Sequence, residues 1–585
     1  MRRRQGTELQ GEFALWAQTF RSGGRALLKA GLCTAAVNVL ALTGPLYMLE
    51  VYSAALPSRS LARLFVLTLA MLGLYALGGV IDLLRQRLLV HAAQRVELNL
   101  STKAFAIVHE APLREGARGD GLEPVRDLDQ IRSFLSGQGP ATLFDLPWIP
   151  LYLGAIFILH PLLGLLAAAG ALLLVALMLL AELTSAAPAR RAAQSAAQRS
   201  SFAVSALRSA QAARAMGFTA RLGRRWQVIN AGHSKGQRNA ARPAAIISSA
   251  IKAIRPALQS SMLGLGAFLV ITDSASAASM FAASIILSRA LAPVEAAITH
   301  WRGFVAARQS LSRLTWRPAA GPSARLSKPP SPRPSSSLSV ERLSITPPGA
   351  RCPVIHDVSF ALTTGTGLAI IGPSGSGKST LARALVGLWQ PGDAAHGSVR
   401  LDGRSIGQWG ADDLGRHIGY VPQRIELLEG TIADNIARFD PRACQEKIAA
   451  AARAAGAHDL IEGLPAGYMT EIGESGVALS DGQRQRIALA RALFGEPFLV
   501  VLDEANANLD AQGEKVLAKA IASVRGRGGI VVVVTHRRST LAGVDTVLAL
   551  SRGRVCAYGP KEAVLARAVE LSPAATAVRE AARAL

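Results

Sequence analysis

The sequence predicts an all-α transmembrane domain of six helices followed by an α/β nucleotide-binding domain. Half of the 585 residues are hydrophobic, and in the first half of the chain they gather into apolar spans of about 20 residues. The second half contains a phosphate-binding motif between a strand-like run and a helix-like run. A chain of this length cannot share one hydrophobic core, so at least two domains are expected.

Six apolar spans can be placed in the first half of the chain. A helix needs about 20 mostly apolar residues to cross a hydrocarbon core of about 30 Å. An arginine-rich segment precedes the first span, but no small-residue cleavage site follows it, so we expect a retained helix instead of a cleaved secretory signal. The predicted spans are residues 26–47, 64–84, 148–159 with their flanks, 162–183, 244–271 and 277–298.

The distribution of Lys and Arg predicts the orientation of these spans. Cytoplasmic loops of membrane proteins accumulate both residues. Segments 85–145 and 184–243 contain many of them, whereas the turns at 160–161 and 272–274 contain none. Both termini and both long loops are therefore expected in the cytoplasm. Helix-period apolar residues in the loops predict that they continue the membrane helices inward and dock on another domain.

A Pro/Ser-rich stretch at residues 317–338 separates the two halves, because it cannot bury enough apolar surface to fold. The net charge of +24 could indicate nucleic-acid binding, but the basic residues are spread along the chain and beside the spans, so no nucleic-acid partner is expected. The predicted organisation is a cytoplasmic segment (1–25), a transmembrane domain (26–316), this linker, and a nucleotide-binding domain (339–585).

The motif GPSGSGKST predicts where a nucleotide binds. Glycines let backbone N–H groups curl around a β-phosphate, while the following helix directs its positive end at the same charge. Lys378 is expected to reach the β- and γ-oxygens of ATP, and Ser379 to bind Mg²⁺. The predicted contacts with the nucleotide are Gly372, Pro373, Ser374, Gly375, Ser376, Gly377, Lys378, Ser379 and Thr380.

Residues 498–504, FLVVLDE, read as a second buried strand that ends in two acids. Asp503 is expected to hold Mg²⁺, and Glu504 to polarise the attacking water. Gln423 is expected to bind the metal and sense the γ-phosphate, and His536 to contact that phosphate and position Glu504. A lone Gln or His is more often structural, but a place at a strand end beside a phosphate loop favours function. Lys378, Glu504 and His536 form the predicted catalytic group.

Residues 478–493, ALSDGQRQRIALARAL, resemble the signature motif of ATP-binding-cassette proteins, and the resemblance extends over about 339–567. It implies that Ser480, Gly482 and Gln483 bind the γ-phosphate of ATP held by another subunit. One phosphate loop and one signature per chain then imply a homodimer with two equivalent sites.

Further loops extend this resemblance. Residues 420–423 and 508–510, together with His536, resemble the Q-, D- and H-loops of these proteins, and residues 470–476 resemble an exporter loop that senses the membrane domain.

Three departures accompany these matches. Asp481 replaces the usual glycine of the signature, Ala505 replaces the usual proline after the catalytic glutamate, and residues 344–353 contain no Tyr or Phe to stack on adenine.

The membrane half carries a second resemblance. Residues 45–60 (PLYMLEVYSAALPSRS), 127–135 (DLDQIRSFL) and 144–152 (FDLPWIPLY) resemble type I secretion exporters of the protease and lipase branch, although Ser53 and Ala54 stand where Asp-Arg is expected. This implies a bacterial inner-membrane protein that works with a periplasmic membrane-fusion adaptor and an outer-membrane channel. Its substrate would be a secreted polypeptide rich in glycine and aspartate.

The 25 residues before the first span leave no room for a leader-cleaving protease, so the substrate is expected to leave uncut. The same architecture could instead move lipids or amphipathic small molecules. The fold alone does not distinguish these substrates from a polypeptide. A soluble ATPase conflicts with the six spans. Four widely separated cysteines, Cys33, Cys352, Cys444 and Cys556, are expected to be unpaired packing residues in a reducing compartment.

Overall fold

The computed structural model describes residues 26, 28–115, 121–316, 332–350, 352–389, 397–473, 479–506, 511–535 and 537–570. The described residues form two compact units, one helical and one α/β, and each is treated by itself. Of the predicted linker, 317–331 lie outside the described residues, and Ser337 and Leu338 belong to the first strand of the α/β unit.

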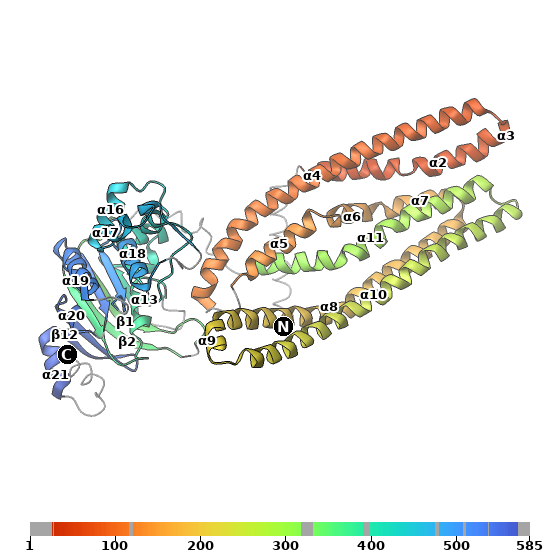
Figure 1. The fold of residues 1–585 in the computed structure, drawn as a ribbon. Helices are drawn as coiled ribbons and strands as arrows, with labels where there is room; N and C mark the ends of the chain where they lie inside the picture. The colour runs from red at the N-terminus through yellow and green to blue at the C-terminus, as the bar shows by residue number, and fades with distance from the viewer. Residues whose placement is uncertain are drawn as a thin grey trace. The chain divides into compact units, whose positions relative to one another are not determined.

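The helical unit contains six helices long and apolar enough to cross a membrane, as the sequence predicted. Several continue far beyond a membrane: α4 has 55 residues and α10 has 53, which is about 80 Å at 1.5 Å per residue. After a helical stretch at 28–40, the elements are α2 (Thr43–Glu50), the π-helix η1 (Val51–Ala55), α3 (Leu56–Ser58), α4 (Leu61–Glu115), α5 (Glu123–Leu135), α6 (Gly139–Asp145), the 3₁₀ turn η2 (Leu146–Trp148), α7 (Ile149–Leu159), α8 (Pro161–Arg208), α9 (Ala210–Ala215), α10 (Thr219–Ile271) and α11 (Ala277–Trp316) (Figure 1).

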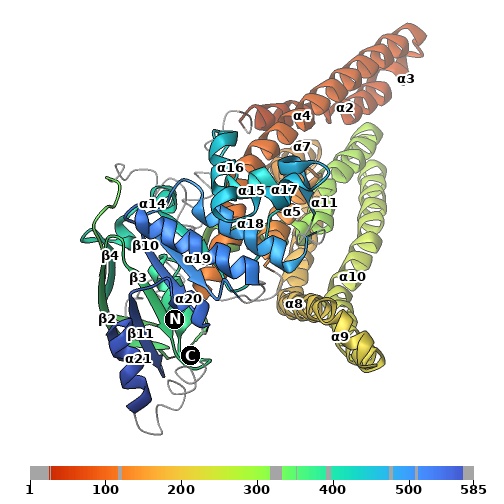
Figure 2. The ribbon, with the colours of Figure 1, turned by 60° about the vertical axis from the view of Figure 1, so that its left-hand side comes forward.

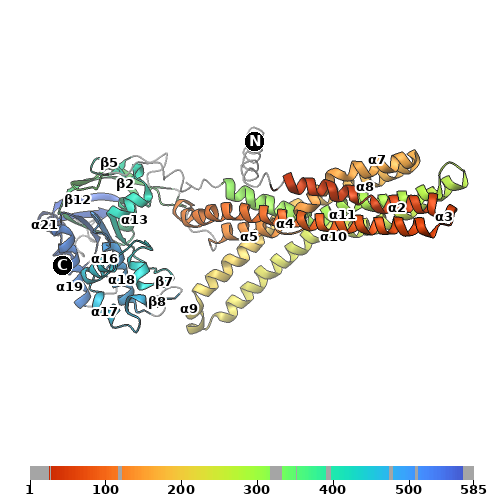
Figure 3. The same cartoon turned by 90° about the horizontal axis from the view of Figure 1, so that it is seen from above.

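An apolar core joins α7, α8, α10 and α11. It includes Ile156, Leu163, Met262 and Leu287, none more than 1% exposed. Helices α8 and α10 run side by side to a shared tip formed by α9 (Figure 3). Many other large apolar side chains of this unit are exposed, Leu61 and Phe65 on α4 among them, as expected for surfaces that face lipid or another chain.

The α/β unit is built on a six-stranded sheet with the order β12-β11-β3-β10-β9-β6, parallel except for β12. A separate antiparallel sheet has the order β2-β1-β4-β5, and β7 pairs with β8. The strands are β1 (Ser337–Ile345), β2 (Ile355–Thr363), β3 (Gly367–Ile371), β4 (Ser398–Leu401), β5 (Arg404–Ser405), β6 (Ile418–Val421), β7 (Gly430–Thr431), β8 (Glu471–Ile472), β9 (Leu499–Asp503), β10 (Ile530–Val534), β11 (Thr546–Ser551) and β12 (Arg554–Pro560).

Strands β3, β9 and β10 are buried at every position, which confirms the expectation from their continuous apolar runs. Alternate residues enter two cores, one shared with α16, α18 and α19, the other with α13 and the antiparallel sheet. Figure 2 shows α19 lying along the sheet, with α16, α17 and α18 beside one another. The helices are α13 (Lys378–Leu385), α14 (Ala411–His417), α15 (Ile432–Ile436), α16 (Gln445–Ala454), α17 (His458–Glu462), α18 (Asp481–Leu493), α19 (Ala511–Gly526), α20 (Arg538–Leu541) and α21 (Lys561–Glu570), with 3₁₀ turns η3 (Ile406–Gln408) and η4 (Gly467–Met469).

The four cysteines are unpaired, as expected. The expectation that they pack in cores is wrong for three of them, since Cys352, Cys444 and Cys556 are exposed and only Cys33 is partly buried. Their spacing along the chain excluded a disulfide framework but contained no information on burial.

Arg438 joins two helix ends of the α/β unit. Its guanidinium donates hydrogen bonds to the carbonyls of Arg491 (3.0 Å), Ala492 (3.2 Å) and Gly415 (2.5 Å). These carbonyls lie in the last turns of α18 and α14, where the helix dipole is negative. Burial, with Arg491 nearby, lowers the pKa of the Arg438 side chain to about 10, so it remains charged at neutral pH.

Arg438→Met should destabilise the protein, because helix-end carbonyls lose their donor while the apolar stem is kept. Leaving a buried carbonyl unpaired costs about 1–3 kcal/mol, and the Arg491 and Ala492 carbonyls are partly buried, so a loss of roughly 3 kcal/mol is expected. Thermal unfolding of the detergent-solubilised chain measures it. Arg554→Met, at an exposed position on β12, is the matched control and should leave the unfolding midpoint unchanged. Equal midpoints for the two variants would contradict this role of Arg438.

Candidate functional site

The loop between β3 and α13 has the conformation that its glycines predict. Gly372, Gly375 and Gly377 have φ values of 148°, 78° and 99°, which favour glycine. A Cβ atom on Gly372 would lie 2.1 Å from the carbonyl oxygen of Leu550, so the loop passes too close to β11 for any side chain. Gly377 is the N-cap of α13, and the positive end of this helix therefore opens into the loop.

Lys378 spans the loop. Its Nζ donates to the carbonyls of Gly372 (2.8 Å) and Pro373 (2.9 Å), which uses two of its three N–H donors. Burial lowers the pKa of the Lys378 ammonium, while Glu504 and Asp503 act in the opposite direction. The side chain lies inside the cradle, with one donor left for a phosphate oxygen.

Ser379 and Asp503 meet at the floor of the site, although 124 residues separate them. The Ser379 hydroxyl donates to Oδ1 of Asp503 at 2.9 Å. Asp503 is fully buried, and its Oδ2 has no hydrogen-bond partner among the described residues. Burial raises the pKa of the Asp503 carboxyl, against the hydrogen bond from Ser379. A buried carboxylate oxygen without a partner, beside a hydroxyl, fits a hard divalent cation that prefers oxygen ligands.

Glu504 and Gln423 also come together, at the ends of neighbouring strands. The Gln423 side chain donates to Oε2 of Glu504 at 2.9 Å. Glu504 has a φ of 53°, a left-handed conformation that costs a non-glycine residue about 1–3 kcal/mol. Its N–H donates to the carbonyl of Val534 at 3.1 Å, which anchors this conformation to β10. The carboxylate is therefore directed by contacts from two neighbouring strand ends.

The signature residues form the N-terminus of α18. The Ser480 hydroxyl accepts a hydrogen bond from the N–H of Gln483 (3.3 Å), and the Gln483 side chain accepts one from the N–H of Ser480 (2.9 Å). This capping box fixes the start of the helix, with Gly482 between the two residues.

Asp481 is the first residue of α18 and forms an ion pair with Arg484. Its side chain is 65% exposed. A carboxylate in the first turn is favoured by the helix dipole. Within this chain the acid is paired and open to solvent, where water and salt screen its charge.

Gln485 was missed by the motif analysis. Its side chain is buried in α18 and donates to the carbonyl of Ala505, the residue that follows Glu504. The signature helix is therefore tied to the backbone beside Glu504 of the same chain. A polar residue on an otherwise apolar helix face was the signal available in the sequence, but its distant partner was not.

Several predicted loops cannot be placed. His536, residues 508–510 and residues 474–478 lie outside the described residues. Among the described residues that flank these gaps, the Asn506 side chain donates to the hydroxyls of Thr535 and Thr540, both at 3.2 Å. Of the predicted adenine region, 344–350 and 352–353 are described, and β2 continues from it to place Ile355 against Gly377.

Glu504→Gln should preserve ATP binding and abolish most hydrolysis, because the carboxylate that orients water is lost while Lys378 and Ser379 remain. We expect kcat to fall by about 10² or more with little change in Kd for ATP. Glu496→Gln is a matched control, since Glu496 shares the left-handed backbone (φ 53°) but precedes β9 at the opposite end of the strand. Full turnover in Glu504→Gln would remove Glu504 from this role.

Asp481→Gly should hardly change the ATP concentration for half-maximal hydrolysis, because the exposed carboxylate is already neutralised by Arg484. Glycine at this helix position should lower stability by at most about 1 kcal/mol. Steady-state hydrolysis and thermal unfolding measure the two effects. A marked fall in the ATP requirement would instead show that the carboxylate repels bound phosphate.

Comparisons with known proteins agree with these motifs. A family model described as ABC transporter transmembrane region matches residues 27–291, and one described as ABC transporter matches residues 355–507. The chain is 49% identical over 549 residues to the type I secretion system ATP-binding protein PrsD of Rhizobium meliloti (strain 1021), covering 94% of each chain.

Two further similarities are more distant. The chain is 29% identical to the toxin RTX-I translocation ATP-binding protein of Actinobacillus pleuropneumoniae, over 91% of this chain and 75% of that protein. The solved structure of a bacterial Atm1-family ABC exporter with ATP bound has a TM-score of 0.80 at 23% identity, covering 95% of this chain and 98% of that one. This last likeness shows the fold.

Proposed function

The chain belongs to the ABC transporter family and couples ATP hydrolysis to transport across a membrane, and we propose that it exports an uncleaved, acidic, glycine-rich polypeptide. The observation that carries this proposal is the 49% identity over nearly the whole chain to a protein named as a type I secretion ATP-binding protein. The proposed domains are those of the sequence analysis: 1–25, 26–316, 317–338 and 339–585.

The proposed setting follows from the same relationship. The chain acts as a homodimer in the bacterial inner membrane, with both termini in the cytoplasm. A periplasmic membrane-fusion adaptor and an outer-membrane channel complete the path. No nucleic acid takes part.

The site supports a division of roles among its residues. Lys378 and the loop of residues 372–380 bind the phosphates of ATP, and Glu504, directed by Gln423, orients the attacking water. Ser379, Asp503 and Gln423 would hold Mg²⁺, which when bound supplies positive charge against the phosphate oxygens. His536, which lies outside the described residues, is proposed to contact the γ-phosphate. Ser480, Gly482 and Gln483 complete the equivalent site of the second chain.

The charge of the α8–α9–α10 arm favours an acidic substrate. Residues 183–272 contain 13 Lys and Arg but no Asp or Glu, whereas residues 85–145 contain eight of each sign. The rule that cytoplasmic loops are rich in Lys and Arg does not account for the lack of acids, because it is not a rule about net charge. Among the described residues no ion pair involves the arm between Arg190 and Arg242.

The length of this arm argues against lipid headgroups as the ligand of its outer charges. Arg208 lies 23 residues beyond the candidate span that ends at Ser185, about 35 Å along the helix. The Debye length is about 8 Å at physiological ionic strength, so the tip does not sense the membrane surface. An acidic polypeptide that approaches from the cytoplasm could pair with basic residues along the whole length of the arm.

Deleting the gene should abolish secretion of an acidic, glycine-rich protein of uncleaved length. Complementation with the intact gene should restore secretion, and complementation with the Glu504→Gln allele should not. Mass spectrometry of the culture medium measures the loss and the intact N-terminus of the substrate. Unchanged secretion together with altered lipid distribution or drug resistance would favour export of lipids or amphipathic small molecules instead.

A further inference from the structure

The first membrane span is interrupted within its length. It is helical over residues 28–40 and again in α2, with a turn between them. In the turn, the N–H of Leu42 bonds to the carbonyl of Val39 (3.1 Å) instead of continuing the α-helical pattern to Asn38. Pro45 has no N–H and cannot continue that pattern either. The carbonyl of Asn38 is thus released from the helix.

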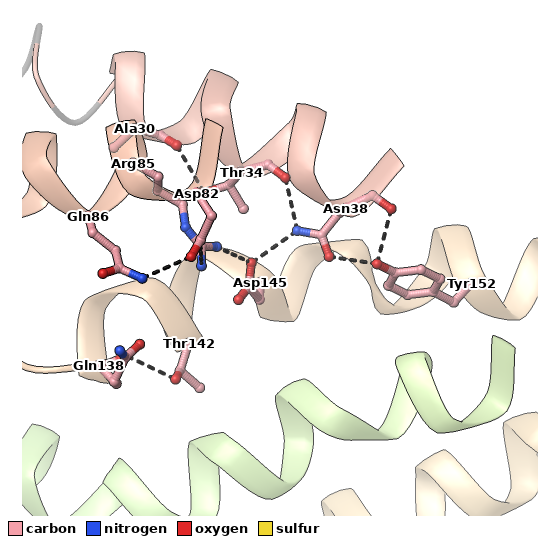
Figure 4. Close-up of polar contacts among 10 residues, drawn as sticks. All are labelled: Ala30, Thr34, Asn38, Asp82, Arg85, Gln86, Gln138, Thr142, Asp145 and Tyr152. Carbon is pink, nitrogen blue, oxygen red and sulfur yellow. Dashed lines mark hydrogen bonds and ion pairs between the residues drawn. The ribbon is translucent and has the colours of Figure 1, made fainter. Parts of the chain in front are cut away.

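A hydroxyl from another span donates toward the released carbonyl and toward the side-chain oxygen of the same residue. Tyr152 of α7 places its OH 3.1 Å from the Asn38 carbonyl and 2.8 Å from Asn38 Oδ1 (Figure 4). Tyr152 is 2% exposed. A backbone carbonyl without a partner is costly where no water reaches it. Tyr152 therefore stabilises the interrupted form of the span.

Asn38 links span 1 to α6 and, through Asp145, to α4. Its amide donates to Oδ1 of Asp145 in α6 (3.0 Å) and to the carbonyl of Thr34 (2.9 Å). The same Asp145 oxygen accepts from Arg85 of α4 at 2.9 Å, and Arg85 also pairs with Asp82 at 2.6 Å. Figure 4 shows these side chains converging from three parts of the chain. We call Asn38, Tyr152, Asp145, Arg85 and Asp82 the span-1 network.

The network has features of a switch as well as of structural support. The Asn38 carbonyl has two alternative partners: the Tyr152 hydroxyl when the span is interrupted, and the N–H of Leu42 when it is straight. Exchanging one for the other keeps the Asn38 carbonyl paired in both forms. Arg85 is 7% exposed, yet its Nε has no hydrogen-bond partner in the described part of the chain, which leaves a donor for a second arrangement.

The segment beyond the interruption is suited to move. It contains the π-helix η1, and its contact with α11 includes the stacked rings of Tyr52 and Phe281, 4.9 Å apart. Leu46 and Leu56, 60% and 56% exposed, show that its outer face is not packed within the chain. Its inner face is packed, chiefly against α11, so a change in its angle requires that contact to rearrange while the outer face stays exposed.

We propose that Tyr152 and Asn38 are positioning residues for transport, which hold span 1 in an interrupted form that α4 and α6 can release through Arg85 and Asp145. The straight form arises when the Leu42 N–H recovers the Asn38 carbonyl, and α2 to α3 then change direction. The ATP-driven cycle alternates the two forms. The proposal rests on ATP-coupled transport by this chain and not on the identity of its substrate.

Spin labels at Leu32 and Leu46 test whether span 1 alternates between these two forms, because both positions are exposed and flank the interruption. In a straight helix, 14 residues span about 21 Å. The full-length protein, with its native cysteines replaced and diluted with unlabelled protein, is measured in nanodiscs without nucleotide and with ATP and vanadate. We expect two distance populations whose ratio changes with nucleotide.

Tyr152→Phe removes only the hydroxyl and should shift the nucleotide-free ratio toward the straight form by roughly tenfold, as for the loss of one buried hydrogen bond. ATP hydrolysis should continue while secretion falls. Tyr47→Phe is the matched control: the Tyr47 hydroxyl contacts Thr68 at 3.0 Å and so also joins span 1 to α4, but beyond the interruption. It should behave as the unmodified protein.

Charge reversal gives a second test that does not depend on how well Tyr152→Phe folds. Arg85→Asp alone should remove the nucleotide response, and adding Asp145→Arg should restore it. Unaltered distances in Tyr152→Phe, equal effects of Tyr152→Phe and Tyr47→Phe, or no restoration by the double reversal would overturn the proposal. Because ATP and vanadate are the only ligands used, failure here is distinguishable from a wrong substrate class.

Discussion

The hydrogen bond between Ser379 and Asp503 is the contact on which the catalytic half of this protein depends. It joins the helix after the phosphate loop to the end of the neighbouring central strand, across 124 residues. Parallel strands make it possible, because their carboxyl ends meet at one edge of the sheet. β10 lies between β3 and β9, so Thr535, which follows β10, also lies at this edge. A fully buried Asp503 with one oxygen unpartnered is unfavourable alone, which indicates that the edge is shaped for a bound cation and phosphate.

The buried strands that form this edge could be recognised in the sequence for a physical reason. Doubly buried strands read as continuous apolar runs, and the residues that follow them must share the sheet edge. The six membrane spans could also be predicted from the sequence, since length and hydropathy are local properties. The antiparallel sheet was not predicted, because its strands β1 and β4 are 50 or more residues apart and their pairing depends on register. Gln485 and Tyr152 were not predicted, because each acts on a backbone carbonyl far away in the chain.

The membrane half handles polar groups in two different ways. In the span-1 network, Arg85 faces two carboxylates and Asn38 donates to one of them, so the polar groups pair across helices within the chain. On the arm of α8, α9 and α10, thirteen basic residues between 183 and 272 have no acid of their own segment to pair with. The span-1 network fixes the positions of helices within the chain. The second makes sense only if the counter-charges come from outside the segment, and solvent ions alone would not require that acids be absent.

Glu504 and Asn38 illustrate one principle in the two halves. Each has a backbone that departs from its regular element, a left-handed φ at Glu504 and a released carbonyl at Asn38. Each departure is stabilised from a distance, by Gln423 and Gln485 around Glu504 and by Tyr152 at Asn38. Side chains exchange partners more readily than regular backbone ladders do, because only a few torsions must change. Irregular backbone held in this way is suited to the changes of partner that a cycle of ATP binding, hydrolysis and transport requires.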